Sequence, residues 1–236
     1  AIYNGMIAPL HPLSIRGVIW YQGESNRRFA HEYRSLFPEM ITDWREQWGG
    51  SGGSDFPFYF VQIAPFTYPG DVGETAELRE AQLMALSLPN TGMVVTMDIG
   101  DPNDIHPGNK RDVGERLALW ALAKTYGQEG FQYSGPLYAG FDREGTQLRI
   151  RFDHAEGLAA RGGVFEGFEI AGEDRVWQAA EASIEGDSVL LSAPGVPEPV
   201  AARYGWDDDE NPTLINGAGL PASPFRTDDW PRVTQP

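Results

Sequence analysis

The first half of the chain alternates short apolar stretches with longer stretches of mixed polarity. The apolar stretches are typical of strands buried in a parallel sheet, and they lie at residues 18–21, 58–63 and 93–97. The longer stretches predict helices at residues 33–48, 75–88 and 110–126. Pro38 is expected in the first turn of the first helix, where its missing N–H is tolerated, and Gly49 is expected to end that helix. Alternating strands and helices predict a parallel sheet with helices on its faces.

Beyond residue 128 the pattern changes to short segments of alternating polarity, separated by turns of Gly, Pro, Asp and Glu. The segments lie at residues 147–152, 164–170, 176–184 and 188–191. Such spacing predicts a β-rich region. We therefore divide the chain into an α/β part, residues 1–128, and a smaller β-rich part, residues 129–236, that packs on it.

Two of the predicted strands run directly into polar loops. The first is followed by Gln22-Gly23-Glu24-Ser25-Asn26, and the third is followed by a loop with three Asp residues that leads to His106. In open α/β folds, ligands bind at the carboxyl ends of the strands. The pattern therefore predicts a functional site at that edge of the sheet.

Composition narrows the possible partners. The formal net charge of −16 argues against binding nucleic acid or an anionic membrane through bulk electrostatics. There is no Cys, which excludes disulfides, thiolate catalysis and Cys-based zinc sites within this chain. No apolar run approaches the roughly 20 residues of a membrane-spanning helix. A hydrophobic content of 41% is typical of a globular protein.

Four motifs, in order along nearly the whole chain, carry a resemblance to a known family. They are Trp20-Tyr21-Gln22-Gly23-Glu24-Ser25-Asn26, its lead-in from Tyr3 to Leu10, Ile105-His106-Pro107 with Lys110, and the run from Gly219 to Asp228. The first is similar to the W-x-Q-G-E-S-N/D signature of SGNH-type carbohydrate esterases. The other three resemble the bacterial sialate O-acetylesterase branch.

The resemblance implies a fold and an activity. The fold is the flavodoxin-like, three-layer α/β sandwich of SGNH hydrolases, with residues 1–128 as the C-terminal portion of the catalytic domain and 129–236 as an accessory region. The activity is removal of acetyl groups from carbohydrates by Ser-His-Asp hydrolysis, without a metal or cofactor, in the periplasm or outside the cell. Sialic acid and plant polysaccharides such as xylan or xyloglucan both remain possible substrates.

His106 is the candidate general base. An esterase needs a base near neutral pKa to take the proton of a nucleophilic hydroxyl, and a carboxylate to fix the imidazole tautomer. The family pattern is Asp-x-x-His, but the position three before His106 is Asn103. We choose Asp104 as the orienting acid, and Asp98, Asp101 or a backbone carbonyl remain alternatives.

Gln22 and Gly23 are the candidates for stabilising the oxyanion. The tetrahedral intermediate of acyl transfer concentrates charge on one oxygen, which prepositioned N–H donors stabilise. Ser25 stands where the superfamily has its oxyanion Asn, so Gln22 is expected to replace that donor. Glu24 is expected to anchor the loop.

The nucleophilic Ser of the family is not found. The run Gly49-Gly50-Ser51-Gly52-Gly53 fits a Gly-x-Ser-x-Gly pattern, but it follows a predicted helix and not a strand, so we reject it. The chain opens with Ala1 and enters a family motif at once. We expect the nucleophile on a segment before Ala1 or on a second polypeptide, which makes this chain part of the active enzyme.

Two other classes of function compete with this hypothesis. A carbohydrate-binding protein could retain the fold without the nucleophile. A metal-dependent hydrolase could use His106 with Asp98, Asp101 and Asp104 as ligands to a divalent ion. An upstream nucleophile motif would argue against the first, and insensitivity to chelators would argue against the second.

Overall fold

A parallel sheet of three strands forms the centre of the first half of the protein. The computed structural model describes residues 3–49 and 55–236. The strands β1 (Val18–Tyr21), β2 (Phe58–Val61) and β3 (Thr91–Val94) lie in the order β1-β2-β3 and pair in parallel. All three therefore end at the same edge of the sheet.

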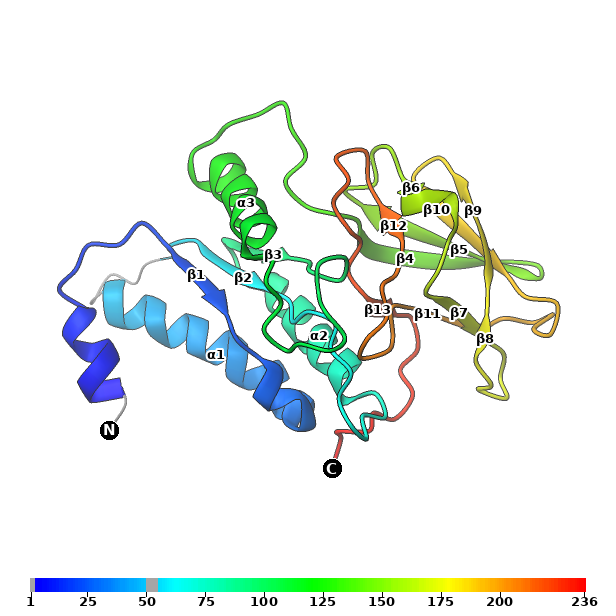
Figure 1. The fold of residues 1–236 in the computed structure, drawn as a ribbon, viewed down its shortest axis with the longest axis horizontal. Helices are drawn as coiled ribbons and strands as arrows, with labels where there is room; N and C mark the ends of the chain where they lie inside the picture. The colour runs from blue at the N-terminus through cyan, green and yellow to red at the C-terminus, as the bar shows by residue number, and fades with distance from the viewer. Residues whose placement is uncertain (1–2, 50–54) are drawn as a thin grey trace.

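Helices cover both faces of this sheet (Figure 1). α1 (Ala30–Gly49) and α2 (Glu74–Met84) pack on one face against Phe58, Phe60 and Met93. α3 (Lys110–Trp120) packs on the other face against Tyr59 and Val61. Successive β2 residues alternate between the two cores, as the pleat requires. The three-layer α/β fold is confirmed.

The second half is antiparallel and has a core of its own. One sheet has the order β4 (Leu137–Glu144), β5 (Gln147–Asp153), β10 (Ser188–Ser192), β9 (Glu181–Glu185). The other has the order β13 (Phe225–Arg226), β11 (Ala201–Tyr204), β7 (Phe168–Ala171), β8 (Gln178–Ala179), and β12 (Leu214–Ile215) pairs with β6 (Ala159–Ala160). Ile150, Ile170 and Tyr204 are fully buried between these sheets. The predicted β-rich region is confirmed.

Short helical turns complete the chain. Their bounds are Tyr3–Ile7 and Ala121–Thr125 for the π-helical turns, and Ala8–Leu10, Glu24–Phe29, Ala85–Ser87 and Arg161–Gly163 for the 3-10 turns. Within the described residues, no helix combines the length and the apolar character needed to cross a membrane.

Several predicted boundaries were wrong for identifiable reasons. α1 begins at Ala30 because the turn Glu24–Phe29 leads directly into it, so Pro38 lies inside the helix and not in its first turn. Residues 176–184 are not one strand, since β8 and β9 belong to different sheets. β4 and β11 were not predicted. Of the glycine-rich run, residues 50–54 lie outside the described part of the chain.

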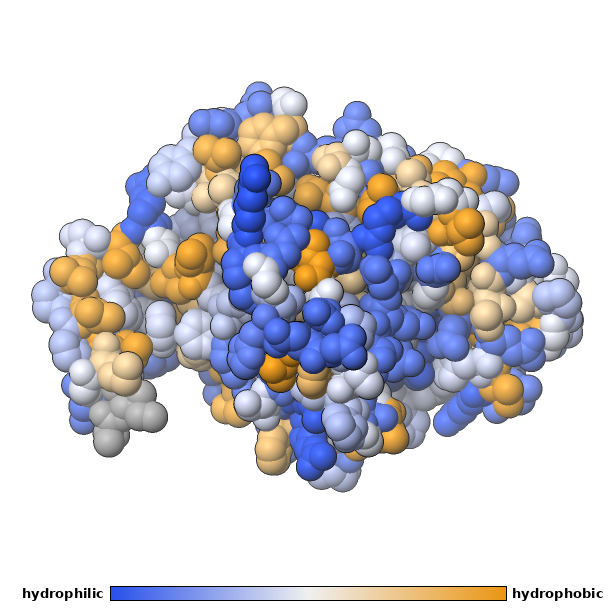
Figure 2. Space-filling view, viewed as in Figure 1, coloured by the Kyte–Doolittle hydropathy of each residue, from blue (hydrophilic) through white to orange (hydrophobic). Residues whose placement is uncertain are grey.

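β1 is the edge strand of the parallel sheet, and this overturns the expectation that residues 18–21 are buried. Val18 and Trp20 pack toward α1, which places Ile19 on the opposite face, where α3 does not reach it. Ile19 is 69% exposed. Figure 2 shows apolar side chains gathered over β1 and the turns before it. Met6 and Leu13, which precede β1 in the chain, are 67% and 58% exposed. In the part of the chain that the structure describes, no strand pairs with the outer edge of β1.

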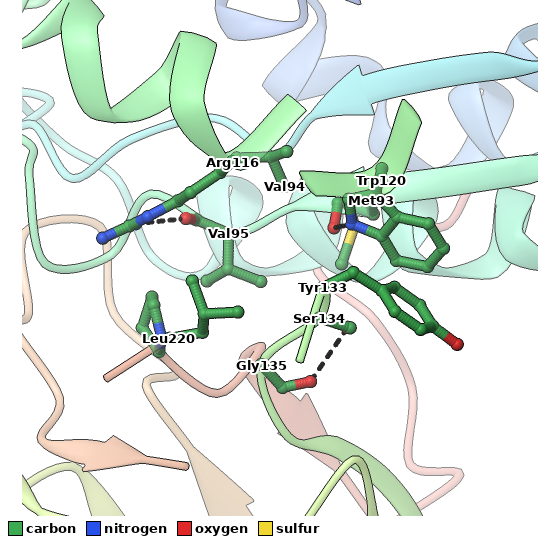
Figure 3. A pocket seen from close by; sticks show the side chains of 10 residues that line it. Met93, Val94, Val95, Arg116, Trp120, Tyr133, Ser134, Gly135 and Leu220 are labelled. Atoms are coloured by element: carbon green, nitrogen blue, oxygen red, sulfur yellow. Dashed lines mark hydrogen bonds between the residues drawn. The ribbon is translucent and has the colours of Figure 1, made fainter. Parts of the chain in front are cut away.

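The two halves meet in tight packing between α3, β3 and the segment that leads into β4 (Figure 3). Trp120 Nε1 donates to the Met93 carbonyl at 3.0 Å, and Arg116 Nη1 donates to the Val95 carbonyl at 2.7 Å. The space left among these side chains and Ser134 is about 10 Å³. That volume holds at most one water, so the junction is packed and is not a ligand site.

Candidate active site

The loops that follow β1 and β3 meet at the carboxyl edge of the parallel sheet and enclose a cavity of about 390 Å³. Its lining residues are Tyr21, Gln22, Glu24, Ser25, Ile105, His106 and Lys110. Two of the predicted site residues, His106 and Gln22, therefore face one cavity although 84 positions separate them. Gly23 directly follows Gln22 and Asp104 lies two residues before His106, but neither is part of the lining.

His106 lies in an exposed loop whose shape Asp104 helps to fix. The backbone N–H of His106 donates to Asp104 Oδ1 at 2.8 Å, which closes a two-residue turn. Within residues 3–49 and 55–236, no hydrogen bond or ion pair joins the His106 imidazole to a carboxylate. Asp104 therefore contacts the backbone of His106 and not its imidazole ring. That Asp104 orients the ring stays a prediction.

The alternative carboxylates are engaged elsewhere. Asp98 accepts from Arg116 Nη1 and Nη2 at 2.7 and 2.6 Å, and Arg161 Nη1 lies 3.6 Å away from it. Asp101 Oδ1 accepts from the Asn103 N–H at 2.9 Å. Neither residue forms, with His106, a group of three ligand atoms close enough to share a metal ion among the described residues.

Gln22 is held by hydrogen bonds at both ends of its side-chain amide. Its Nε2 donates to Asn26 Oδ1 at 2.6 Å, and its Oε1 accepts from the Tyr33 hydroxyl at 3.2 Å. An amide nitrogen carries two hydrogens, so one N–H of Gln22, which lines the cavity, is left without an acceptor among the described residues. A side-chain amide held in place with one unused N–H is the kind of group that can donate to an oxyanion.

Gly23, the residue after Gln22, is buried. A Cβ at this position would lie 2.9 Å from Ile63 Cγ2 and 3.0 Å from Gln82 Nε2, so only glycine fits without displacement. Gln82 Nε2 also donates to the Gln22 carbonyl at 3.2 Å. Within the described residues the Gly23 N–H has no acceptor. The close packing of this turn fixes the direction in which Gln22 points.

The cavity also contains groups to which the sequence pattern assigned no catalytic role. Lys110 Nζ lies 4.8 Å from the centre of the Tyr21 ring. Burial raises the pKa of Tyr21 to about 12, with Glu24 and Tyr68 adding to the effect, so its hydroxyl stays protonated. Glu24 was expected to anchor the loop, but in the described chain its carboxylate makes no hydrogen bond and it lines the cavity. Lys110 could have been predicted as a site residue from the sequence, since it belongs to the same motif as His106.

Residues 2–123 match the family described as carbohydrate esterase, sialic acid-specific acetylesterase. The chain belongs to this family. Sialate O-acetylesterase of Mus musculus is 38% identical over 153 residues, which cover 58% of this chain and 28% of the mouse protein. The Homo sapiens sialate O-acetylesterase is 36% identical over 152 residues, covering 58% of this chain and 29% of the human protein.

A carbohydrate acetylesterase of known structure has the same fold. The crystal structure of a carbohydrate acetylesterase from Xanthomonas citri superposes with a TM-score of 0.92 at 46% identity. The match covers 97% of this chain and 54% of that chain. The chain thus spans about half the length of the Xanthomonas protein and under a third of the mammalian ones.

Proposed function

We propose that this protein acts in the hydrolysis of acetyl esters on carbohydrates, with His106 as general base and Gln22 as oxyanion donor. The observation that carries the proposal is that both residues line one cavity in a chain of the carbohydrate esterase family. A fixed amide donor and an exposed imidazole in one cavity are the minimum that acyl transfer needs besides a nucleophile.

The reaction proceeds in two steps. The His106 imidazole takes the proton of a serine hydroxyl, whose oxygen attacks the acetyl carbon, and the carbonyl oxygen gains negative charge. Gln22 Nε2 and the Gly23 N–H stabilise that charge, a contribution of about 2.7–4 kcal/mol for one donor in comparable enzymes. His106 then protonates the departing sugar oxygen. In the second step water, deprotonated by His106, releases acetate from the serine.

The nucleophilic serine is proposed to come from a polypeptide segment placed beside β1. The unpaired edge of β1 and the exposed Ile19 support this, because uncovered edges of parallel sheets are unusual. A further parallel strand beside β1 would end next to Gln22, and the residues following it would reach the cavity that contains His106. Ser25, which is exposed and lines the cavity, is the competing candidate.

The substrate is proposed to be an acetylated sugar of a polysaccharide or glycoconjugate. Such polymers are too large to enter a bacterial cytoplasm, so we also propose action in the periplasm or outside the cell. Acetate release from O-acetylated sialic acid and from acetylated xylan, measured side by side, distinguishes the two substrate classes.

A fluorophosphonate probe tests the reaction and locates its serine. Labelling followed by peptide mapping is expected to find the probe on a serine outside residues 1–236, and His106→Ala is expected to abolish both labelling and hydrolysis of p-nitrophenyl acetate. A probe attached to Ser25 would contradict the separate nucleophile. An unlabelled, inert protein that still binds glycans would favour the carbohydrate-binding alternative.

A further inference from the structure

A second cavity, of about 300 Å³, lies where the β-rich half meets the start of α2. Its walls come from α2, β7, β11, β13 and the C-terminal tail, and it shares no lining residue with the cavity that contains His106. Asp71, at its edge, forms an ion pair of 2.9 Å with Arg27, three residues after Glu24. The second cavity therefore flanks the loop of the candidate active site.

Three tryptophans and three arginines are in contact with one another at and beside this cavity, and three of these six residues, Trp206, Arg203 and Arg226, line it. The Arg203 guanidinium lies 4.1 Å from the Trp177 ring and 5.3 Å from the Trp206 ring, and Arg226 lies 5.6 Å from Trp206. Trp177 in turn packs on Trp230 at 5.2 Å, and Arg175 lies 5.1 Å from the Trp230 ring. The contacts of Arg203 and Arg226 hold the half-buried Trp206 ring in place at the cavity wall.

Most charged groups of the lining are already paired. Arg203 and Arg226 each lie 3.1 Å from Asp228, and Arg226 also lies 3.0 Å from Glu80. Glu77 accepts from the backbone N–H groups of Val233 and Thr234 at 2.6 and 3.0 Å. The arginines are thus committed to protein carboxylates, which leaves little positive charge for an anionic ligand.

Among the lining residues, Glu169 and Asp207 have carboxylate oxygens that accept no hydrogen bond within the described part of the chain. The Glu169 carboxylate makes no hydrogen bond within the described residues, and only one carboxylate oxygen of Asp207 accepts, from the Asp208 N–H at 2.7 Å. Burial raises the pKa of Glu169, and the negative charge of Asp207 adds to it while Arg203 opposes it. Free carboxylate oxygens beside an aromatic face match a ligand that offers hydroxyl donors and an apolar face.

We propose that this cavity is a second carbohydrate-binding site, which holds one neutral pyranose unit against Trp206 with its hydroxyls donating to Glu169 and Asp207. A volume near the lower limit for small-molecule sites suits a single ring. The excess of carboxylates over arginines in the lining excludes sugars that carry a carboxylate. The site needs no acetyl ester, so it does not depend on the proposed reaction.

Calorimetric titration of the purified protein with xylohexaose and cellohexaose tests the site. At least one of these unacetylated neutral sugars is expected to bind, with an affinity lowered about tenfold by Trp206→Ala and less by Trp206→Phe, which keeps an aromatic face. Glu169→Gln is expected to weaken binding as well. Phe131→Ala, which removes an exposed aromatic ring elsewhere, is the matched control and is expected to bind as the wild type does.

Thermal unfolding of each variant separates loss of the site from loss of the fold. Folded Trp206→Ala that binds as tightly as the wild type, or a wild type that binds only an acidic oligosaccharide such as an oligogalacturonate, would overturn the proposal. Hydrolysis of p-nitrophenyl acetate by the wild type reports the esterase reaction separately. A protein that hydrolyses this ester but binds neither neutral sugar refutes the second site alone.

Discussion

Arg116 donates to both carboxylate oxygens of Asp98, at 2.7 and 2.6 Å, and also to the Val95 carbonyl at 2.7 Å. Asp98 is the start of the loop that carries His106, and Val95 directly follows β3. One guanidinium on α3 therefore fixes the strand end and the loop base together. Both side chains of the pair are nearly buried, so water screens their interaction weakly.

We expect Arg116→Lys to lower kcat about tenfold, because a lysine cannot replace the paired contact and a loop shift of about 1 Å is costly for catalysis. KM should change little, since the lining of the cavity is retained. Arg111→Ala is the control, as Arg111 is on the same helix in an exposed ion pair with Glu115. Equal kinetics for the two variants would show that the pair does not position His106.

Gln22→Ala should lower kcat by about 10²–10³-fold with a smaller effect on KM, as expected for a donor that acts in the transition state. Tyr33→Phe removes the hydroxyl that holds Gln22 Oε1 and should cause a smaller loss of the same kind. Steady-state kinetics on p-nitrophenyl acetate measure both, with Gln47→Ala on the exposed face of α1 as control. A Gln22→Ala variant with normal kcat would remove Gln22 from the mechanism.

Asp104→Asn discriminates between two roles of this side chain. An asparagine keeps the oxygen that accepts from the His106 N–H, so a purely structural Asp104 would tolerate the change. An acid that orients the imidazole would not, and losses reach about 10⁴-fold in kcat for such a change in serine proteases. We expect the large loss, and only a small one for Asp101→Asn. Comparable, small losses for both would mean that another group orients His106.

The parallel sheet could be predicted because each of its strands has a clear local pattern. The run 58–61 is apolar throughout, as a central strand with helices on both faces must be. β4 could not be predicted in the same way, since Gly140 interrupts it at a bulge and its last residues are charged and exposed. Burial of β1 was overestimated because a sequence does not reveal which strand lies at the edge.

The position of the candidate site could be predicted because ligands of open α/β folds bind at the carboxyl ends of the strands. His106 and Gln22 both follow strands, so their meeting could be expected from the topology. From the sequence, Asp98 was an alternative to Asp104 as the acid that orients His106. Its ion pair with Arg116 could not be predicted, because it joins residues 18 positions apart. The open position of Glu24 likewise depends on the path of its loop, which local pattern does not determine.

Gly23→Ala is expected to destabilise the protein by about 2 kcal/mol or more, because the new methyl group overlaps Ile63 in a packed region. Gly114→Ala is the opposite case. Gly114 lies inside α3, and no atom lies within 4 Å of the position that an alanine methyl group would occupy, so the change should stabilise by about 0.5–1 kcal/mol. Urea unfolding of both variants measures the difference. Equal stability would show that the turn at Gly23 adapts to a side chain.

Glu210 should make the protein less stable as the pH rises from about 4.5 to 7. Burial raises the pKa of its carboxyl to about 7, with Asp207 and Glu169 adding to the effect and Arg79 opposing it. In that pH window the unfolded chain has released this proton while the folded chain retains it, so each rise in pH favours unfolding.

At pH 8 the folded state contains a half-buried Glu210 charge that, within the described residues, has one oxygen without a hydrogen-bond partner. Glu210→Gln should therefore stabilise by about 1–2 kcal/mol at pH 8, after allowance for solvent screening, and have little effect at pH 4. Thermal unfolding of the variant and wild type across this range, with the exposed Glu46→Gln as control, measures the difference, and a constant offset at all pH values would contradict it.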